Sequence, residues 1–233
     1  MGATSVVPIF YGGEAMILAS GSPRRRRLLE ELGIEVHVMP QDVDETRREG
    51  EPPERLVERL ARLKADSCLG DPAVRGGGQT VLAADTIVWD SDGDVLGKPR
   101  DAEEAHRMLR ALSGRESRVS TGVCLARVDG GGDVTRRSFV ETTRVLFWDL
   151  TDNEIDAYVR SGEPMDKAGA YGIQGRGRLL VRAIMGDYSN VVGLPVSRLV
   201  RELDESFPEG QGLLQAALLG GAGGTTDDGG ETE

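Results

Sequence analysis

The stretch Thr-Val-Leu-Ala-Ala-Asp-Thr-Ile-Val-Trp, residues 80–89, is a nearly unbroken apolar segment of this 233-residue chain. A run of this length and composition is typical of a strand that is buried on both faces, as in α/β proteins whose helices cover both sides of a sheet. Asp85 interrupts the run, and an ionised carboxylate in a buried strand is costly unless it is paired or binds a metal. Asp85 is therefore either held by backbone N–H groups or part of a functional site.

The residues before this strand predict two helices. Ser22 is a favourable N-cap and Pro23 suits the first helical position, so we expect a helix from there to about Gly33. Residues 53–68 repeat leucines along one helical face. The short alternating segment 34–38 predicts a strand between the two helices.

The residues after the strand continue the alternation of helix and strand. Asp101 is followed three residues later by Glu, which predicts a capped helix ending near Gly114. Residues 118–128 and 135–148 flank a Gly-rich turn and predict a β-hairpin, and Thr151 begins another capped helix. This order of elements indicates an α/β layer architecture.

Composition divides the chain into three parts. We expect a short N-terminal extension at 1–15, a folded domain at 16–207, and an acidic, Gly-rich tail at 208–233 whose composition predicts disorder. Within the tail, the apolar patch 213–219 has room for one or two helical turns.

Charge and residue usage exclude several classes of protein. The formal net charge is −11, but the eight acidic residues from Glu202 onward leave only −3 for the rest, so nothing favours nucleic acid as a partner. No apolar run reaches the roughly 18–20 residues that span a bilayer. Cys68 and Cys124 lie far apart and only two histidines occur, which argues against a disulfide framework, a zinc site and a His-based triad. We expect a cytoplasmic protein.

Four consecutive arginines, residues 24–27, begin the first predicted helix, where cations oppose the helix dipole. The last two each have a Glu one turn later, whereas Arg24 and Arg25 have none. Together with Ser20, Ser22 and the free N–H groups of the first turn, these two arginines form a candidate anion site. The alternative is a solvated basic turn.

Lysine is rare in this chain, which has 25 arginines and three lysines, namely Lys64, Lys98 and Lys167. Arginine serves wherever a generic positive charge suffices, so these positions are candidates for a compact ammonium in contact with phosphate. Chance retention of three lysines is the alternative.

Two further groups have both a functional and a structural interpretation. The cluster Asp42, Asp44 and Glu45 is either a solvated turn or, beside a phosphate site, a source of oxygen ligands for Mg²⁺. In the Gly-rich segment 166–175, Gln174 either presents its amide to the edge of a base or satisfies loop backbone groups.

Taken together, these segments resemble the Maf family of nucleoside triphosphate pyrophosphatases. Six stretches match in the family's order, at residues 18–25, 61–65, 83–88, 97–101, 166–175 and 186–195. The resemblance implies an α/β fold with a mixed twisted sheet, helices on both sides and two lobes around a cleft, related to the inosine triphosphatase fold. It also implies hydrolysis of a nucleoside triphosphate to the monophosphate and pyrophosphate with a divalent metal cation, Mg or Mn.

The resemblance also implies roles for individual residues. Asp85 matches the proton acceptor that activates water, and the family associates three positions with substrate choice, which are Arg25, Thr86 and Gln174. Four residues match the family's polar positions that bind the phosphates of the substrate, and these are Ser20, Arg24, Lys64 and Lys98. Two carboxylates, Glu45 and Asp85, match the positions that bind the metal.

The loop at 166–175 is similar to the branch that acts on dTTP and UTP, with modified pyrimidine nucleotides as further candidates, and a homodimer is compatible with the resemblance. Two alternatives stay open: a preference for 7-methyl-GTP, against which Gln174 argues, and a non-catalytic nucleotide-binding regulator of cell division. Retention of Asp85, Glu45 and the lysines favours the enzyme.

Overall fold

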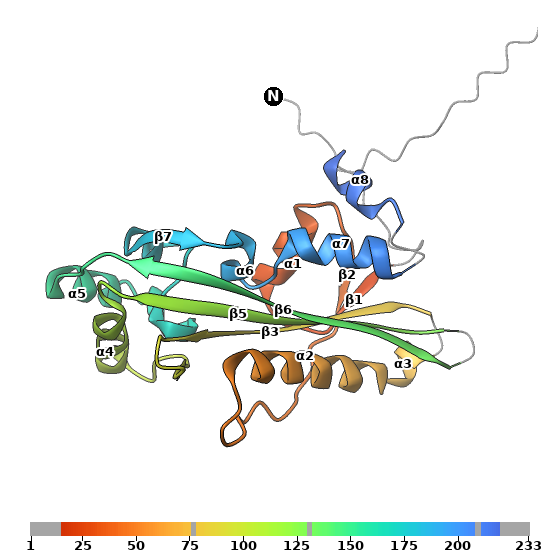
Figure 1. Cartoon of the computed structure of the whole chain (residues 1–233), viewed down its shortest axis with the longest axis horizontal. Coiled ribbons are helices and arrows are strands. Elements are labelled where there is room, and N and C mark those ends of the chain that lie inside the picture. Colours follow the sequence, from red (N-terminus) through yellow and green to blue (C-terminus); the bar gives the residue numbers. More distant parts are fainter. Residues whose placement is uncertain (1–14, 76–77, 130–131, 208–210, 220–233) are drawn as a thin grey trace, which may run out of the picture.

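The computed structural model describes residues 15–75, 78–129, 132–207 and 211–219. Its centre is a seven-stranded mixed sheet in the order β2-β1-β3-β5-β6-β7, with β4 added to β3 (Figure 1). The strands are β1 (Met16–Leu18), β2 (Val36–Val38), β3 (Thr80–Trp89), β4 (Val95–Leu96), β5 (Glu116–Val128), β6 (Val134–Phe147) and β7 (Val181–Met185).

The helices connect and cover these strands. The α-helices are α1 (Pro23–Glu30), α2 (Pro53–Leu69), α3 (Pro72–Arg75), α4 (Ala102–Leu112), α5 (Asp152–Arg160), α6 (Tyr188–Val192), α7 (Val196–Ser206) and α8 (Leu213–Leu218). Three 3₁₀ helices lie between α5 and β7: η1 (Glu163–Asp166), η2 (Ala168–Ala170) and η3 (Arg176–Leu179). The predicted segments at 80–89, 53–68 and the hairpin are all confirmed to within two residues.

The predicted helix caps are formed. Ser22 accepts a hydrogen bond from the backbone N–H of Arg25, and Asp101 accepts one from that of Glu104. Thr151 and its Glu three residues later form a complete capping box. These caps satisfy N–H groups that a helix leaves unpaired at its first turn.

Strand β3 lies near the middle of the sheet. It pairs antiparallel with β5 along its whole length, from Thr80 opposite Arg127 to Trp89 opposite Arg118. The β5–β6 hairpin extends this antiparallel region, whereas β1 runs parallel to both β2 and β3. The sheet is therefore mixed, as the family resemblance implies.

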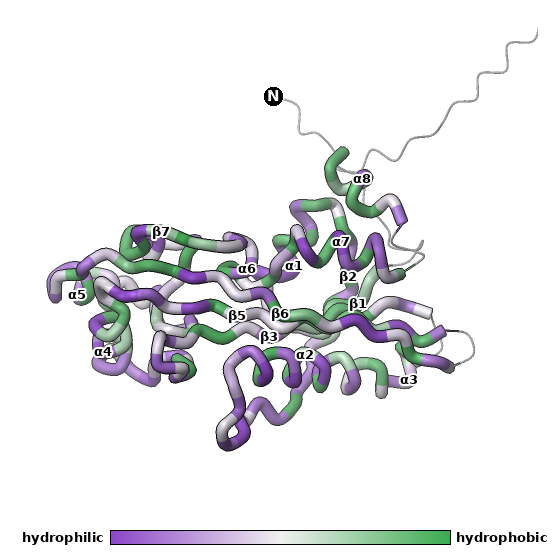
Figure 2. Tube along the Cα trace, viewed as in Figure 1, coloured by the Kyte–Doolittle hydropathy of each residue, from purple (hydrophilic) through white to green (hydrophobic). Residues whose placement is uncertain are grey.

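Helices cover both faces of the sheet (Figure 1). Helix α2 packs on one face above small residues that include Ala83 and Cys124, and α1 and α7 pack on the other face above Leu82 and Leu125. Figure 2 shows hydrophilic and apolar residues alternating along α2, the pattern of a helix with one face on a sheet.

Helix α2 approaches β5 unusually closely. A Cβ atom added at Gly122 would lie 2.2 Å from the carbonyl oxygen of Val57, so only glycine fits at this position. The main chain of the helix thus rests directly on the main chain of the strand.

A second core lies at the other end of the long strands. Helices α4 and α5 and the 3₁₀ segments pack there around Leu109, Phe147, Ile155, Tyr158 and Tyr171. The molecule therefore has two lobes that share β3, β5 and β6.

The tail is partly folded, in contrast to the disorder expected for it as a whole. Helix α8 packs on α7, and Leu213 is only 4% exposed within the same core as Leu203 and Phe207. Helix α8 lies within the apolar patch 213–219, which the sequence shows to have room for one or two helical turns, and these apolar residues supply the contact. The expected extension, apart from residue 15, lies outside the described residues. In the tail, residues 208–210 and 220–233 also lie outside them.

No helix in the described ranges has both the length and the apolar character needed to cross a membrane.

Candidate active site

One edge of β3 is open in its middle. Strand β1 pairs with this edge at residues 81–82 and β4 pairs with it at residues 88–89, and in the described part of the chain no strand pairs between them. Asp85 and Thr86 lie in this gap. The gap follows the carboxyl end of β1 at Leu18, the kind of position at which α/β sheets bind ligands.

Asp85 is buried and paired. Its Oδ1 accepts a 2.5 Å hydrogen bond from Nζ of Lys64, which lies on α2, and each of the two residues is 8% exposed. The same ammonium lies 2.7 Å from Oε1 of Glu45, whose side chain is 59% exposed. The buried charge that interrupts the apolar strand is therefore compensated by a cation, and two carboxylates converge on one point.

The segment that carries Glu45 is attached to α2 through Arg59. This guanidinium donates to both carboxylate oxygens of Glu51, at 2.7 and 2.8 Å, and to the carbonyl oxygen of Thr46 at 3.0 Å. The hydrogen bonds from Arg59 lower the pKa of Glu51 to about 2. Asp44 accepts a hydrogen bond from the N–H of Thr46, so it stabilises the turn next to Glu45.

Arg25 is the buried member of the arginine run. Its guanidinium donates three hydrogen bonds, to the carbonyl oxygen of Gly193 (2.9 Å), to Ser20 Oγ (2.8 Å) and to Thr86 Oγ1 (2.9 Å). Burial lowers the pKa of Arg25, and the charge of Asp85 acts in the opposite direction. Arg25 thus contacts both Ser20, which the sequence places with it in a candidate anion site, and Thr86, which the resemblance associates with substrate choice.

The other arginines of the run are exposed, and within the described part of the chain none of them hydrogen-bonds to this network. Arg26 pairs with Glu30 at 2.6 Å, as expected, but in the described residues Arg27 is exposed and forms no ion pair with Glu31. Arg24 is partly exposed and lies 3.9 Å from Asp166. The expected pairing of the last two arginines therefore holds for one of them.

A cavity of about 240 Å³ lies beside Arg25, between α1, β3 and the 166–175 segment. Its lining contains the three residues that the resemblance associates with substrate choice, which are Arg25, Thr86 and Gln174. It also contains three further cationic residues, Arg24, Lys98 and Lys167. Lys98 is exposed, and no ion pair to it is found in the described part of the chain. Asp166 also lines the cavity and pairs with Lys167 and Arg24, but the four cations outnumber this one carboxylate, so the lining suits an anionic ligand.

Asp85, Lys64, Glu45 and Ser20 are not part of this lining. Ser20 contacts Arg25, which lines the cavity, and Asp85 precedes Thr86, which also lines it. Successive residues of a strand point to opposite faces, so Asp85 faces α2 while Thr86 faces Arg25 and α6. The structure thus places the carboxylates on one face of β3 and the cavity on the other, with the open edge joining them.

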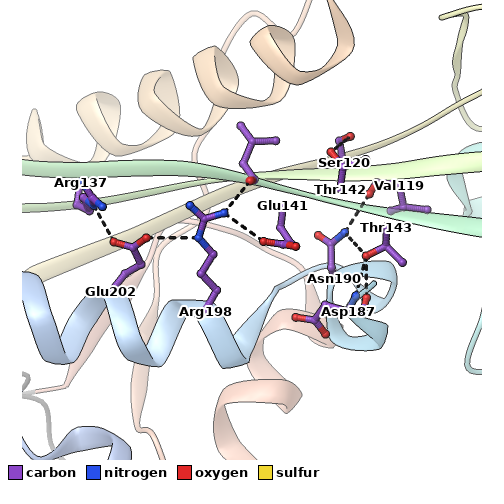
Figure 3. A network of polar contacts seen from close by, with 11 residues as sticks. Val119, Ser120, Arg137, Glu141, Thr142, Thr143, Asp187, Asn190, Arg198 and Glu202 are labelled. Atoms are coloured by element: carbon purple, nitrogen blue, oxygen red, sulfur yellow. Dashed lines mark hydrogen bonds and ion pairs between the residues drawn. The ribbon is translucent and has the colours of Figure 1, made fainter. Parts of the chain in front are cut away.

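The residues that hold Gly193 were not expected from the sequence. Asn190 is fully buried and donates to the carbonyl oxygen of Val119 (2.9 Å) and to Thr143 Oγ1 (3.1 Å), as Figure 3 shows. The Thr143 hydroxyl also donates to the carbonyl of Asp187 and accepts from its N–H. These bonds fix α6 against the sheet, and the lone amide in the apolar Asn-Val-Val segment was the available signal.

Helix α7 is fixed to the same sheet by charged groups (Figure 3). Glu202, 8% exposed, accepts hydrogen bonds from Arg137 at 2.7 Å and from Arg198 at 3.3 Å. Arg198 also donates to the carbonyl oxygen of Val140 and to Glu141. Elements on both sides of Gly193 are therefore anchored to β5 or β6.

The donor set at the carboxylates fits a divalent cation only in part. No group of three or more His, Cys, Asp or Glu side chains suited to a metal occurs in the described ranges. However, Glu45 and Asp85 already converge on one ammonium, and Mg²⁺ commonly takes one or two carboxylates plus substrate phosphates. The residues present therefore fit an ion whose coordination a triphosphate completes.

Known proteins are similar in sequence to this chain along most of its length. Proteins called dTTP/UTP pyrophosphatase are 50% identical over 188 residues in Halalkalibacterium halodurans (81% of this chain, 94% of that protein) and 49% identical over 188 residues in a Geobacillus species (81% and 96%). The corresponding protein of Nitratidesulfovibrio vulgaris is 47% identical over 197 residues (84% and 89%).

Among solved structures, a HAM1 protein from Coxiella burnetii aligns with 82% of this chain and 99% of that one, with a TM-score of 0.46 and 17% identity. Residues 15–206 match the family described as Maf-like protein. The chain belongs to this family.

Proposed function

We propose that the protein is a nucleoside triphosphate pyrophosphatase that converts dTTP and UTP to their monophosphates and pyrophosphate. The observation that carries the proposal is the buried Asp85 carboxylate, held 2.5 Å from Lys64 beside a cavity lined by four cationic side chains. The relatives called dTTP/UTP pyrophosphatase support the substrate class.

In this mechanism Asp85 accepts the proton of a water molecule as the water oxygen bonds to the α-phosphorus. The bond from that phosphorus to the oxygen bridging it to the β-phosphorus breaks, and pyrophosphate leaves. Lys64 orients Asp85, while Arg24 and Lys98 stabilise the charge that develops on the leaving group. Positioning and electrostatic stabilisation provide most of the acceleration in phosphoryl chemistry.

Glu45 and Asp85 would hold a divalent cation, Mg²⁺ or Mn²⁺, together with oxygens of the triphosphate. When bound, the ion neutralises phosphate charge and polarises water. Lys64 now lies between these carboxylates, so its ammonium would share them with the ion.

At the other end of the cavity, Gln174 would select the base. Its amide carries both a donor and an acceptor, which suits the adjacent carbonyl and N–H groups of uracil and thymine. Arg25 and Thr86 also line the cavity and are joined by a hydrogen bond.

The test is a screen for pyrophosphate release over canonical and modified nucleoside triphosphates, including 7-methyl-GTP, with Mg²⁺ or Mn²⁺. We expect release with dTTP and UTP and much less with 7-methyl-GTP. Release of orthophosphate, or tight binding of nucleotide without turnover, would contradict the proposal, and the second result would favour the regulator. A cytoplasmic location, a homodimer and the absence of nucleic acid as a partner stay predictions.

A further inference from the structure

The segment 172–177 carries Gln174 and contributes to one wall of the cavity. Its backbone belongs to no strand, and Gln174 itself is exposed. The cavity lining includes four consecutive residues of this segment, from Gly172 to Gly175. The position of the amide therefore depends on whatever holds this loop.

Two side chains outside the loop hold both of its ends. Glu163 accepts hydrogen bonds from the backbone N–H of Arg176 (Oε2, 2.8 Å) and of Gly177 (Oε1, 3.1 Å). The Tyr158 hydroxyl accepts one from the N–H of Gly172 at 3.1 Å. The same hydroxyl donates to Glu163 Oε1 at 3.0 Å, so the two side chains form one connected clamp.

The glycines of the loop are explained by this clamp. A Cβ at Gly175 would lie 2.3 Å from Oε1 of Glu163, and a Cβ at Gly177 would lie 2.6 Å from the carbonyl oxygen of Gly172 and 2.7 Å from the Tyr158 hydroxyl. A side chain at position 177 would meet main-chain atoms, whereas one at position 175 would displace the Glu163 carboxylate, so the loop is folded tightly onto the two clamp side chains.

Charge supports the same arrangement. Burial by itself would raise the pKa of Glu163, but the hydrogen bonds from Arg176, Gly177 and Tyr158 and the charge of Lys167 outweigh burial and lower it. Burial raises the pKa of Tyr158. At neutral pH the clamp therefore consists of a carboxylate acceptor and a phenol donor, the protonation states that its hydrogen bonds require.

We propose that Glu163 and Tyr158 are positioning residues for base selection, which act by fixing the loop that carries Gln174. Neither side chain lines the cavity. The inference rests on the proposed function, because it assumes that a nucleotide base occupies the cavity next to Gln174. A hydrogen bond to a base requires placement within about 0.5 Å, which a loose loop does not supply.

The experiment compares UTP with CTP, which share the sugar and the triphosphate. In Glu163→Gln an NH₂ group replaces one acceptor, and in Tyr158→Phe the bridging hydroxyl is lost. For both variants we expect the KM for UTP to rise at least tenfold, while the kcat for UTP changes less than about threefold. The kcat/KM for CTP should also change less than about threefold. Glu103→Gln, an exposed glutamate on α4, is the matched control and should behave as the wild type.

A second readout does not depend on activity. Hydrogen exchange of the 172–177 amides should accelerate in Glu163→Gln while the amides of β3 and β5 keep their protection. An equal loss of kcat/KM for UTP and CTP would show a general structural role and overturn the inference. If Glu163→Gln does not fold, the ratio of kcat/KM for UTP to kcat/KM for CTP in Tyr158→Phe decides in the same way. Absence of pyrophosphate release by the wild type would instead refute the proposed function, and unchanged exchange would independently refute the clamp.

Discussion

Lys64 donates a 2.5 Å hydrogen bond to Asp85 across the contact between α2 and β3, and this pair sets the chemistry of the open strand edge. The pair compensates the charge of a carboxylate in a strand whose four preceding residues, 81–84, are apolar and fully buried. It also fixes the direction of Asp85, because one of its two oxygens is taken by the ammonium.

Replacing Asp85 by Asn should abolish turnover and leave nucleotide binding within about tenfold, since the amide keeps the shape of the side chain but accepts no proton. Steady-state pyrophosphate release and equilibrium binding of UTP measure the two effects. Asp92→Asn, in the exposed turn after β3, should change neither. More than a tenth of the wild-type kcat in Asp85→Asn would reject this residue as the base.

Arg25→Lys should lower kcat/KM at least tenfold, because an ammonium does not reproduce the three directions in which the guanidinium contacts Gly193, Ser20 and Thr86. Arg26→Lys is the control, since the Arg26 guanidinium is exposed and pairs with Glu30 on the surface. That pair is worth about 0.2–0.5 kcal/mol. Equal kinetic damage in the two variants would contradict the assignment of Arg25 to the site.

Glu51 predicts a pH dependence of stability. Its pKa is about 2 in the folded protein against an ordinary 4.5, so its stabilisation is complete above about pH 5 and is lost as the pH falls toward 2. Glu51→Gln should therefore lower the free energy of unfolding by about 1.5–3 kcal/mol at pH 6. Urea unfolding at pH 6 and pH 3.5 should show this difference shrinking, and a difference independent of pH would be the contrary result. Glu49→Gln should show no such difference.

Leu213 predicts that the tail contributes to stability. Leu213→Ala, or a chain that ends at Phe207, should lose about 1.5–3 kcal/mol of unfolding free energy, because a buried leucine leaves the core. Leu218, on the same helix, is 79% exposed, and Leu218→Ala should stay within about 0.5 kcal/mol of the wild type. Equal stabilities for the two alanine variants would show that α8 does not pack as described.

Elements with local signals were predictable from the sequence. Strand β3 follows from its apolar run, and α1, α4 and α5 follow from capping residues that act within three or four positions. Strand β7 was missed, because its Val-Arg-Ala-Ile-Met sequence has three exposed residues and no strict alternation. Its place in the sheet depends on pairing with β6, which is a tertiary interaction.

The candidate site divides in the same way. Asp85 is evident from the cost of its charge in a strand, and Arg25 from its lack of a local acidic partner. The position of Lys64 between two carboxylates was not predictable, because it depends on the packing of α2 against β3. The roles of the Gly193 carbonyl and of Glu163 also depend on contacts between elements distant along the chain.

The close contact at Gly122 has a consequence for how this site tolerates sequence change. The separation between α2 and the sheet is set there by main-chain atoms, a carbonyl oxygen of one element against the α-carbon of the other, and Lys64 lies about two helical turns beyond Val57. The helix therefore lies at the smallest separation from the sheet that the main chain permits. A side chain at position 122 would move α2 away from β5, and it would lengthen the distance between the ammonium and the carboxylate at the same time.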